Sequence, residues 1–178
     1  GRAGSEGTLA FMTEITVSLD PFPPKEVMAV CGHCDAMEKS FEANLVALKY
    51  SPTAVELIDG EILELSKGNP SFNSQFSTFN FDDPAALLIT ELRAETREEL
   101  DSQAAALEKD LLDSGLIYKC TRVYGADVSK VWNLRKAGLG ILGSMKGDAK
   151  PMGVIEDTAV AASRMPAYMK DFRALLDR

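Results

Sequence analysis

Residues 85–92 (AALLITEL) are the clearest buried strand in the chain, and a well-marked helix follows them directly. A short apolar run of this composition is typical of a buried strand. Thr96 and Glu99 have the spacing of a capping box, which predicts that a helix begins there, and Gly115 is placed to end it. The expected apolar stripe of this helix is Leu100, Ala104, Leu107 and Leu111. Residues 116–123 predict another strand, so this part of the chain is expected to form a strand, a helix and a second strand in that order.

The rest of the chain continues the alternation of short strands and helices. Pro21, Pro23 and Pro24 form a stiff segment, at which we place a domain boundary, and Asp127 is expected to cap a helix. Further strands are expected at residues 10–19, 25–30, 52–59 and 152–155, and further helices at residues 34–48, 61–67, 128–142 and 165–178. An α+β fold of two layers, with an antiparallel or mixed sheet and helices packed on one face, fits this order better than a doubly wound sheet.

Composition and charge exclude several classes of protein. The 178 residues are 46% hydrophobic and carry a net charge of -8, which argues against nucleic acid or an anionic membrane as the main partner. No apolar run approaches the ~18 residues of a transmembrane helix, so a cytoplasmic location is expected. The three cysteines are not a secreted disulfide framework. Because the chain opens without methionine and already looks like the interior of a folded protein, it is expected to be a piece of a longer one.

Cys31 and Cys34 form a C-G-H-C motif between an expected strand and helix. A thiol at the beginning of a helix has a lowered pKa, so a thiol-disulfide redox module is an alternative hypothesis. Against it, Cys34 continues the apolar stripe of Met37 and Phe41, where a cysteine acts as a small buried hydrophobe. A zinc site is not predicted, because the chain has only one histidine, His33, and too few further soft ligands.

Arg135 is the anomaly of the helix expected from residue 128. At about 100° per residue it falls within the apolar arc of that helix. A guanidinium cannot be deprotonated, so a covered one needs a carboxylate or phosphate from the protein or from a ligand. Candidate partners within the protein are Glu91, Glu156 and Asp157. The apolar residues of the arc are Val128, Val131, Trp132, Leu139 and Leu142.

Two further features allow alternative interpretations. Glu56 lies within an apolar run, where it either contacts a functional site or is satisfied by nearby backbone or lysine. Residues 68–84 form a loop that either is pinned to the core by its phenylalanines or acts as a lid or docking surface.

Three glycines near the end of the helix expected from residue 128 do not make a dinucleotide-binding site, because Gly138, Gly140 and Gly143 follow a helix instead of preceding one. Those glycines are expected to allow close packing and then to end the helix.

Four segments together resemble the FAD-linked oxidases, a group that includes D-lactate dehydrogenases, D-2-hydroxyglutarate dehydrogenases and the glycolate oxidase subunit. The segments are GSEGTL at 4–9, PTAVELID at 52–59, WNLRKA at 132–137 and IEDTAV at 155–160. The last two, at their separation, are the most specific. Ala10 and Ala161 depart from the family pattern, which usually has glycine and proline at these places.

The resemblance implies the organisation of the chain. Residues 1–20 would be the end of an FAD-binding domain whose remainder lies upstream. Residues 21–178 would be the substrate or cap domain, ferredoxin-like in fold and truncated at its C-terminus. The metal-binding and general-base motifs of the family would lie beyond residue 178, so no catalytic or metal-binding residue is expected within this segment. An iron–sulphur domain further downstream occurs in some relatives.

The resemblance also implies a function. The parent protein would be an FAD-dependent oxidoreductase that transfers a hydride from a D-2-hydroxy acid to flavin and passes the electrons to an acceptor. Arg135 matches the arginine that holds the substrate carboxylate. The FAD-binding residues would be Gly4, Ser5, Glu6, Gly7, Thr8 and Leu9. The isolated segment would be inactive; a domain with a packing role only is the remaining alternative.

Overall fold

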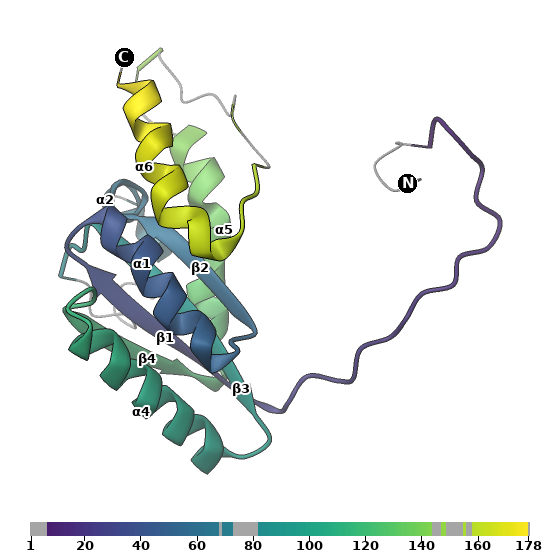
Figure 1. Cartoon of the computed structure of the whole chain (residues 1–178), viewed down its shortest axis with the longest axis horizontal. Coiled ribbons are helices and arrows are strands. Elements are labelled where there is room, and N and C mark those ends of the chain that lie inside the picture. Colours follow the sequence, from purple (N-terminus) through teal and green to yellow (C-terminus); the bar gives the residue numbers. More distant parts are fainter. Residues whose placement is uncertain are drawn as a thin grey trace.

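A four-stranded antiparallel sheet in the order β2-β3-β1-β4 is the centre of the structure (Figure 1). The computed structural model describes residues 7–67, 69–72, 82–143, 147–148, 155 and 158–177. The strands are β1 (Glu26–Cys34), β2 (Ala54–Asp59), β3 (Ala86–Ala94) and β4 (Lys119–Tyr124). The helices are α1 (Met37–Ala47), α2 (Gly60–Lys67), α4 (Arg97–Asp113), α5 (Val128–Gly143) and α6 (Met165–Leu176). Short 3-10 helices are η1 (Leu48–Tyr50), η2 (Pro70–Phe72), η3 (Gly125–Asp127) and η4 (Ala162–Arg164).

The connections of the strands give a ferredoxin-like topology. In each of the units β1-α1-β2 and β3-α4-β4, a helix connects two strands that have one other strand between them in the sheet. This arrangement brings β1 and β3, which are far apart in the sequence, together at the centre of the sheet. The predicted α+β class with an antiparallel sheet is confirmed.

Helices cover both faces of the sheet, whereas the sequence predicted one helical layer. On the first face, α1 and α4 pack on strand residues such as Met28, Val30 and Leu88. On the second face, α5 and α2 cover Ala29 and Ile89. The second layer is built from buried side chains of α2 and α5, namely Leu63, Val128, Val131 and Leu134. The alternation of side chains along a strand explains how β1 and β3 supply both cores.

Helix α4 agrees with its sequence signals. Thr96 accepts a hydrogen bond from the backbone N–H of Glu99, whose side chain accepts one from the backbone N–H of Thr96, so the capping box is formed. Gly115 follows the helix with a φ of +69°, in the left-handed region that glycine tolerates. The four predicted stripe residues are all buried: Leu100, Ala104, Leu107 and Leu111.

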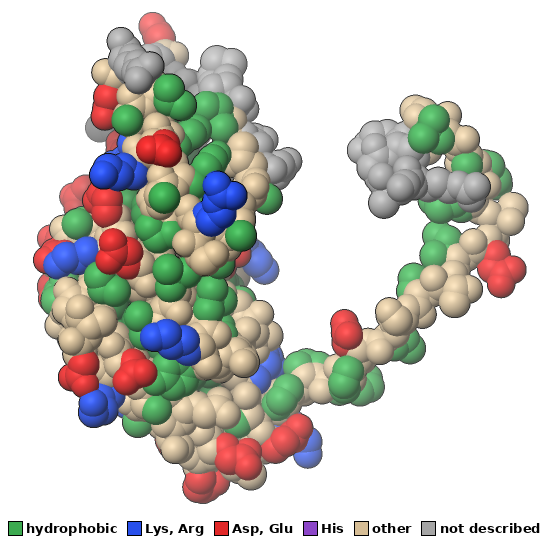
Figure 2. Space-filling view, in the orientation of Figure 1, with side chains coloured by type: hydrophobic (Ala, Val, Ile, Leu, Met, Phe, Trp, Pro, Cys, Tyr) green, Lys and Arg blue, Asp and Glu red, His purple; other side chains and the backbone are tan. Residues whose placement is uncertain are grey.

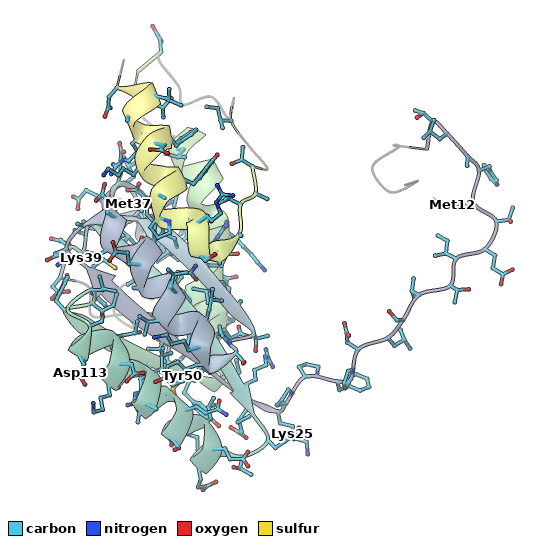
Figure 3. All side chains as sticks on the ribbon, in the orientation of Figure 1. Met12, Lys25, Met37, Lys39, Tyr50 and Asp113 are labelled. Atoms are coloured by element: carbon cyan, nitrogen blue, oxygen red, sulfur yellow. The ribbon has the colours of Figure 1, made fainter. Side chains whose placement is uncertain are left out.

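The chain after β1 departs from its prediction. Strand β1 continues to Cys34 and α1 begins only at Met37, so the C-G-H-C motif lies in a central strand. The buried side chains of α1 are Ser40, Ala43 and Ala47, whereas Met37 and Phe41 line a groove. Next to α1, Tyr50 of η1 donates a hydrogen bond to Asp110 of α4 over 2.6 Å. Tyr50 is labelled in Figure 3.

The N-terminal segment is extended but is not a strand. Between residues 7 and 25 the structure shows no strand, and the segment runs away from the sheet (Figure 1). Its large apolar side chains are open to solvent, with Phe11 94% and Leu19 88% exposed, and Figure 2 shows hydrophobic groups along it. The strand predicted at residues 10–19 is therefore wrong for this chain by itself, because no neighbouring strand is present among the described residues to complete its hydrogen bonds.

Other predictions lie largely outside the described residues. These are the strand at residues 152–155, of which only Ile155 is described, the pair Glu156 and Asp157, and most of the loop at residues 68–84. Among the helices that are described, none combines the length and apolar character needed to cross a membrane.

Candidate functional site

Arg135 of α5 forms an ion pair with Glu56 of β2. Its Nε donates a hydrogen bond to Oε2 of Glu56 over 2.9 Å, and its Nη2 lies 2.8 Å from the same oxygen. The side chains of Arg135 and Glu56 are 45% and 39% exposed. The guanidinium is therefore held by the protein while remaining open to a ligand.

The prediction that Arg135 points into a covered apolar face is wrong. The side of α5 that lies on the sheet contains Val128, Val131 and Leu134, and Arg135 is rotated by about 100° from Leu134. Arg135 instead shares a second side of the helix with Gly138 and Leu142, and this side lines a groove. The side chain of Leu139 is outside what the structure describes.

The groove lies between α5, α6, α1 and α2 and has a volume of about 540 Å³. Two guanidinium groups line it, those of Arg135 and Arg173, together with the carboxylate of Asp59. Arg173 also pairs with Glu38 of α1. The apolar lining consists of Met37, Phe41, Ile62, Leu142, Met169 and Phe172. Figure 3 labels Met37 beside α6. An apolar cleft with a few charged groups at fixed places suits a small organic ligand.

Arg173 was not identified from the sequence. The sequence predicts a helix at residues 165–178, but within it Arg173 looks like an ordinary exposed residue of an amphipathic helix. Its position in the same groove as Arg135 depends on how α6 packs on α1, which a sequence pattern does not contain. A weak signal was available in the spacing of Met169 and Arg173, which lie four residues apart and so share one side of α6.

Glu91 is buried, and its partners exclude it as the partner of Arg135. Its Oε1 accepts a hydrogen bond from Nε of Arg93 over 2.9 Å, and its Oε2 accepts one from Nε1 of Trp132 over 2.7 Å. Trp132 and Arg135 are three residues apart on α5. Each of them is therefore tied to a carboxylate of a different strand, Glu91 on β3 and Glu56 on β2.

The two cysteines of the C-G-H-C motif cannot form a disulfide in this fold. Residues three apart in a strand point to opposite faces and lie about 10 Å apart, beyond the ~7 Å reach of a disulfide. Cys31 belongs to the core under α5, and Cys34 to the core under α1 and α4. Burial raises the pKa of each thiol to about 12. The redox hypothesis is therefore contradicted, and the cysteines are small hydrophobic residues of the core.

The only histidine, His33, is fully buried at the end of β1. Its Nδ1 lies 3.0 Å from Oδ1 of Asp82, and its Nε2 lies 3.5 Å from the hydroxyl of Thr121. Burial lowers its pKa, although the nearby Asp82 carboxylate acts in the opposite direction. Within the part of the chain that the structure describes, His33 has no cluster of histidine, cysteine and carboxylate ligands around it that would hold a metal ion.

The expected FAD-binding residues are only partly described. Gly4, Ser5 and Glu6 lie outside the described residues, whereas Gly7, Thr8 and Leu9 form an exposed turn. Gly7 has a φ of +75°, and no atom of the described residues lies within 4 Å of the position that a Cβ atom would take there. The structure does not bring this turn to Arg135, because the segment that follows it runs away from the sheet (Figure 1).

Comparison with known proteins gives one family. Residues 23–178 match the model of FAD linked oxidases, C-terminal domain. A D-2-hydroxyglutarate dehydrogenase of Haemophilus influenzae is 30% identical over 189 aligned positions that cover 98% of this chain. Proteins with the same name from Pseudomonas putida and Escherichia coli are 27% and 30% identical, again over 98% of the chain. The chain spans 18% of the length of each of these relatives.

Proposed function

The chain belongs to the FAD-linked oxidases, as a C-terminal domain of that family, and from this premise we propose that it is the substrate domain of a flavoenzyme that oxidises a D-2-hydroxy acid. The names of the relatives support a substrate such as D-2-hydroxyglutarate. FAD, when bound, supplies the acceptor for the hydride that leaves the α-carbon. The task of this domain is to bind the substrate and to orient that carbon.

Arg135 is the residue that we propose for the substrate carboxylate. The observation that carries this role is its geometry: Glu56 occupies one edge of the guanidinium, and the side chain is still 45% exposed beside an apolar groove. A planar guanidinium binds a carboxylate through two parallel hydrogen bonds, which fixes the orientation of the carboxylate as well as its position. A fixed carboxylate in turn orients the neighbouring α-carbon for hydride transfer.

We propose residues 1–20 as the end of an FAD-binding domain and residues 21–178 as the substrate domain. The exposed apolar side chains of the extended segment, such as Phe11, Ile15 and Leu19, support this division, because they alternate as in a strand that pairs with another sheet. The glycine turn at Gly7 leaves room for the close approach of a flavin. Gly4, Ser5, Glu6, Thr8 and Leu9 complete the proposed FAD-binding segment.

The setting of the parent enzyme is also part of the proposal. We place it in the cytoplasm, with a separate electron acceptor. The low share of the relatives that this chain covers leaves room for a complete FAD-binding domain and for a further iron–sulphur domain.

The test uses the protein extended at both ends. It should purify with bound flavin, and anaerobic D-2-hydroxyglutarate or D-lactate should bleach the flavin absorption, whereas residues 1–178 alone should purify colourless. Arg135→Met should raise the half-saturating substrate concentration at least about tenfold, because charge-assisted hydrogen bonds are lost. Lys136→Met, which removes a neighbouring exposed charge of the same helix, should leave that concentration within about twofold of the unsubstituted protein. An extended protein that stays colourless with added FAD would contradict the proposal.

A further inference from the structure

Glu56 contacts Arg135 through one carboxylate oxygen. Oε2 of Glu56 accepts the hydrogen bond from Nε and also lies 2.8 Å from Nη2, so it occupies the edge of the guanidinium formed by these two nitrogens. A guanidinium has a second such edge, formed by Nη1 and Nη2. Among the described residues, no hydrogen bond from Nη1 accompanies these two contacts. The pair therefore leaves an edge that suits a second carboxylate.

Glu56 is itself held on a rigid element. It lies in the middle of β2, opposite Ile89 of β3 in the antiparallel register. Arg135 lies on α5, and the hydrogen bond from Trp132 to Glu91 ties the same side of that helix to β3. The backbones on both sides of the ion pair are thus fixed by the sheet, and only the two side chains have rotamers to lose.

An exposed ion pair of this kind contributes little to stability, because solvent screens both charges. Its relevance to a ligand lies in the direction that it gives the guanidinium. Without an acceptor, an arginine side chain that is 45% exposed samples several rotamers, and only a fraction of them presents its outer edge to the groove. The ion pair therefore selects the direction of the guanidinium.

We propose that Glu56 is the positioning residue of Arg135: it fixes the plane of the guanidinium so that the outer edge grips the carboxylate of a D-2-hydroxy acid in the orientation needed for hydride transfer. This inference rests on the substrate role proposed for Arg135. It assigns to Glu56 an effect on the rate of the hydride step. Removing the negative charge of Glu56 does not weaken the attraction between Arg135 and a substrate that is also negative.

The experiment uses the flavin-containing protein extended at both ends, with D-2-hydroxyglutarate as the probe and rapid anaerobic mixing. Two quantities are measured: the limiting rate of flavin reduction and the half-saturating substrate concentration. Glu56→Ala should lower the limiting rate about tenfold, because a misoriented carboxylate misplaces the α-carbon, and should change the half-saturating concentration less than about threefold. Glu56→Gln keeps an oxygen that can accept both N–H groups, so its limiting rate should stay within about threefold of the unsubstituted protein.

Two controls accompany these variants. Glu98→Ala removes an exposed carboxylate from the first turn of α4 and should leave both quantities unchanged. Flavin content and melting temperature report folding; if Glu56→Ala loses flavin, Glu56→Val, with a β-branched residue suited to a strand, takes its place.

The outcomes separate this inference from the function on which it rests. If the unsubstituted protein is reduced by D-2-hydroxyglutarate and Glu56→Ala is reduced at the same limiting rate, the positioning role is wrong and the substrate domain stands. Equal losses in Glu56→Gln and Glu56→Ala would also overturn the role, because charge and not an acceptor oxygen would then matter. If no D-2-hydroxy acid reduces the unsubstituted protein, both proposals fail together.

Discussion

The buried His33 should make the stability of this domain fall as the pH falls below about 6.5, the usual pKa of histidine. Burial lowers the pKa of His33 in the folded protein. Asp82 opposes this shift, but its side chain is 49% exposed and its Oδ1 also lies 3.3 Å from Nζ of Lys119. Between the folded and unfolded pKa values, the unfolded chain therefore binds a proton that the folded chain does not.

The sign and the size of the effect follow from proton linkage. A lowered histidine pKa costs nothing above the unfolded value, and the cost grows as the pH drops below it. For an imidazole that stays neutral in the folded state, the loss is about 1.4 kcal/mol at about pH 5.5 and less than about 0.1 kcal/mol at about pH 7.5. The value at the lower pH is an upper bound, because the attraction of Asp82 retains part of the proton affinity.

The assay is urea unfolding at these two pH values. His33 is the only histidine of the chain, so the difference between the two pH values should largely disappear in His33→Gln, whatever the absolute stability of that variant. Asp82→Asn removes the interaction that raises the histidine pKa, and the pH dependence should persist or increase. The reasoning is refuted if His33→Gln keeps the full pH dependence, or if the imidazole of the folded protein titrates at or above about 6.5 by NMR.

Two more predictions concern the cores. Leu107→Ala should lower the free energy of unfolding by about 2–5 kcal/mol, because Leu107 is fully buried. Leu112→Ala should lower it by less than about 1 kcal/mol, because Leu112 of the same helix is 40% exposed. Urea unfolding checks both, and equal losses would contradict the packing described for α4. Cys31 and Cys34 should react slowly with a thiol reagent at about pH 8 in the native protein and fully in denaturant, because burial raises the pKa of both thiols to about 12. Rapid reaction of these two thiols in the native protein would contradict their burial.

Elements whose signals are local were predictable from the sequence. The capping box of Thr96 and Glu99, the stripe from Leu100 to Leu111 and the glycine at 115 all act within α4, and the structure agrees with each. The strand at residues 10–19 failed for the opposite reason. Its alternating pattern is real, but a strand requires a partner, and the described chain offers none to Phe11 or Leu19.

The C-G-H-C motif shows how a local pattern can mislead. A helix beginning at Cys34 would have given a reactive thiol, but β1 continues through both cysteines because Gly32 and His33 pair with β3 and β4. That pairing is made with residues more than fifty positions away along the chain. The motif alone does not contain this information, and the burial that it produces decides the chemistry of both thiols.

The spacing of Trp132 and Arg135 on α5 matches the positions of their two carboxylate partners in the sheet. Residues three apart on a helix lie on adjacent positions of its surface, and here each reaches a carboxylate on a different strand. Glu91 and Glu56 are diagonal neighbours in the β2-β3 register, since Glu56 lies opposite Ile89 and Glu91 is two residues further along β3. The helix spacing therefore matches the diagonal of the sheet. The partner of Arg135, 79 residues away, is not visible in the helix pattern.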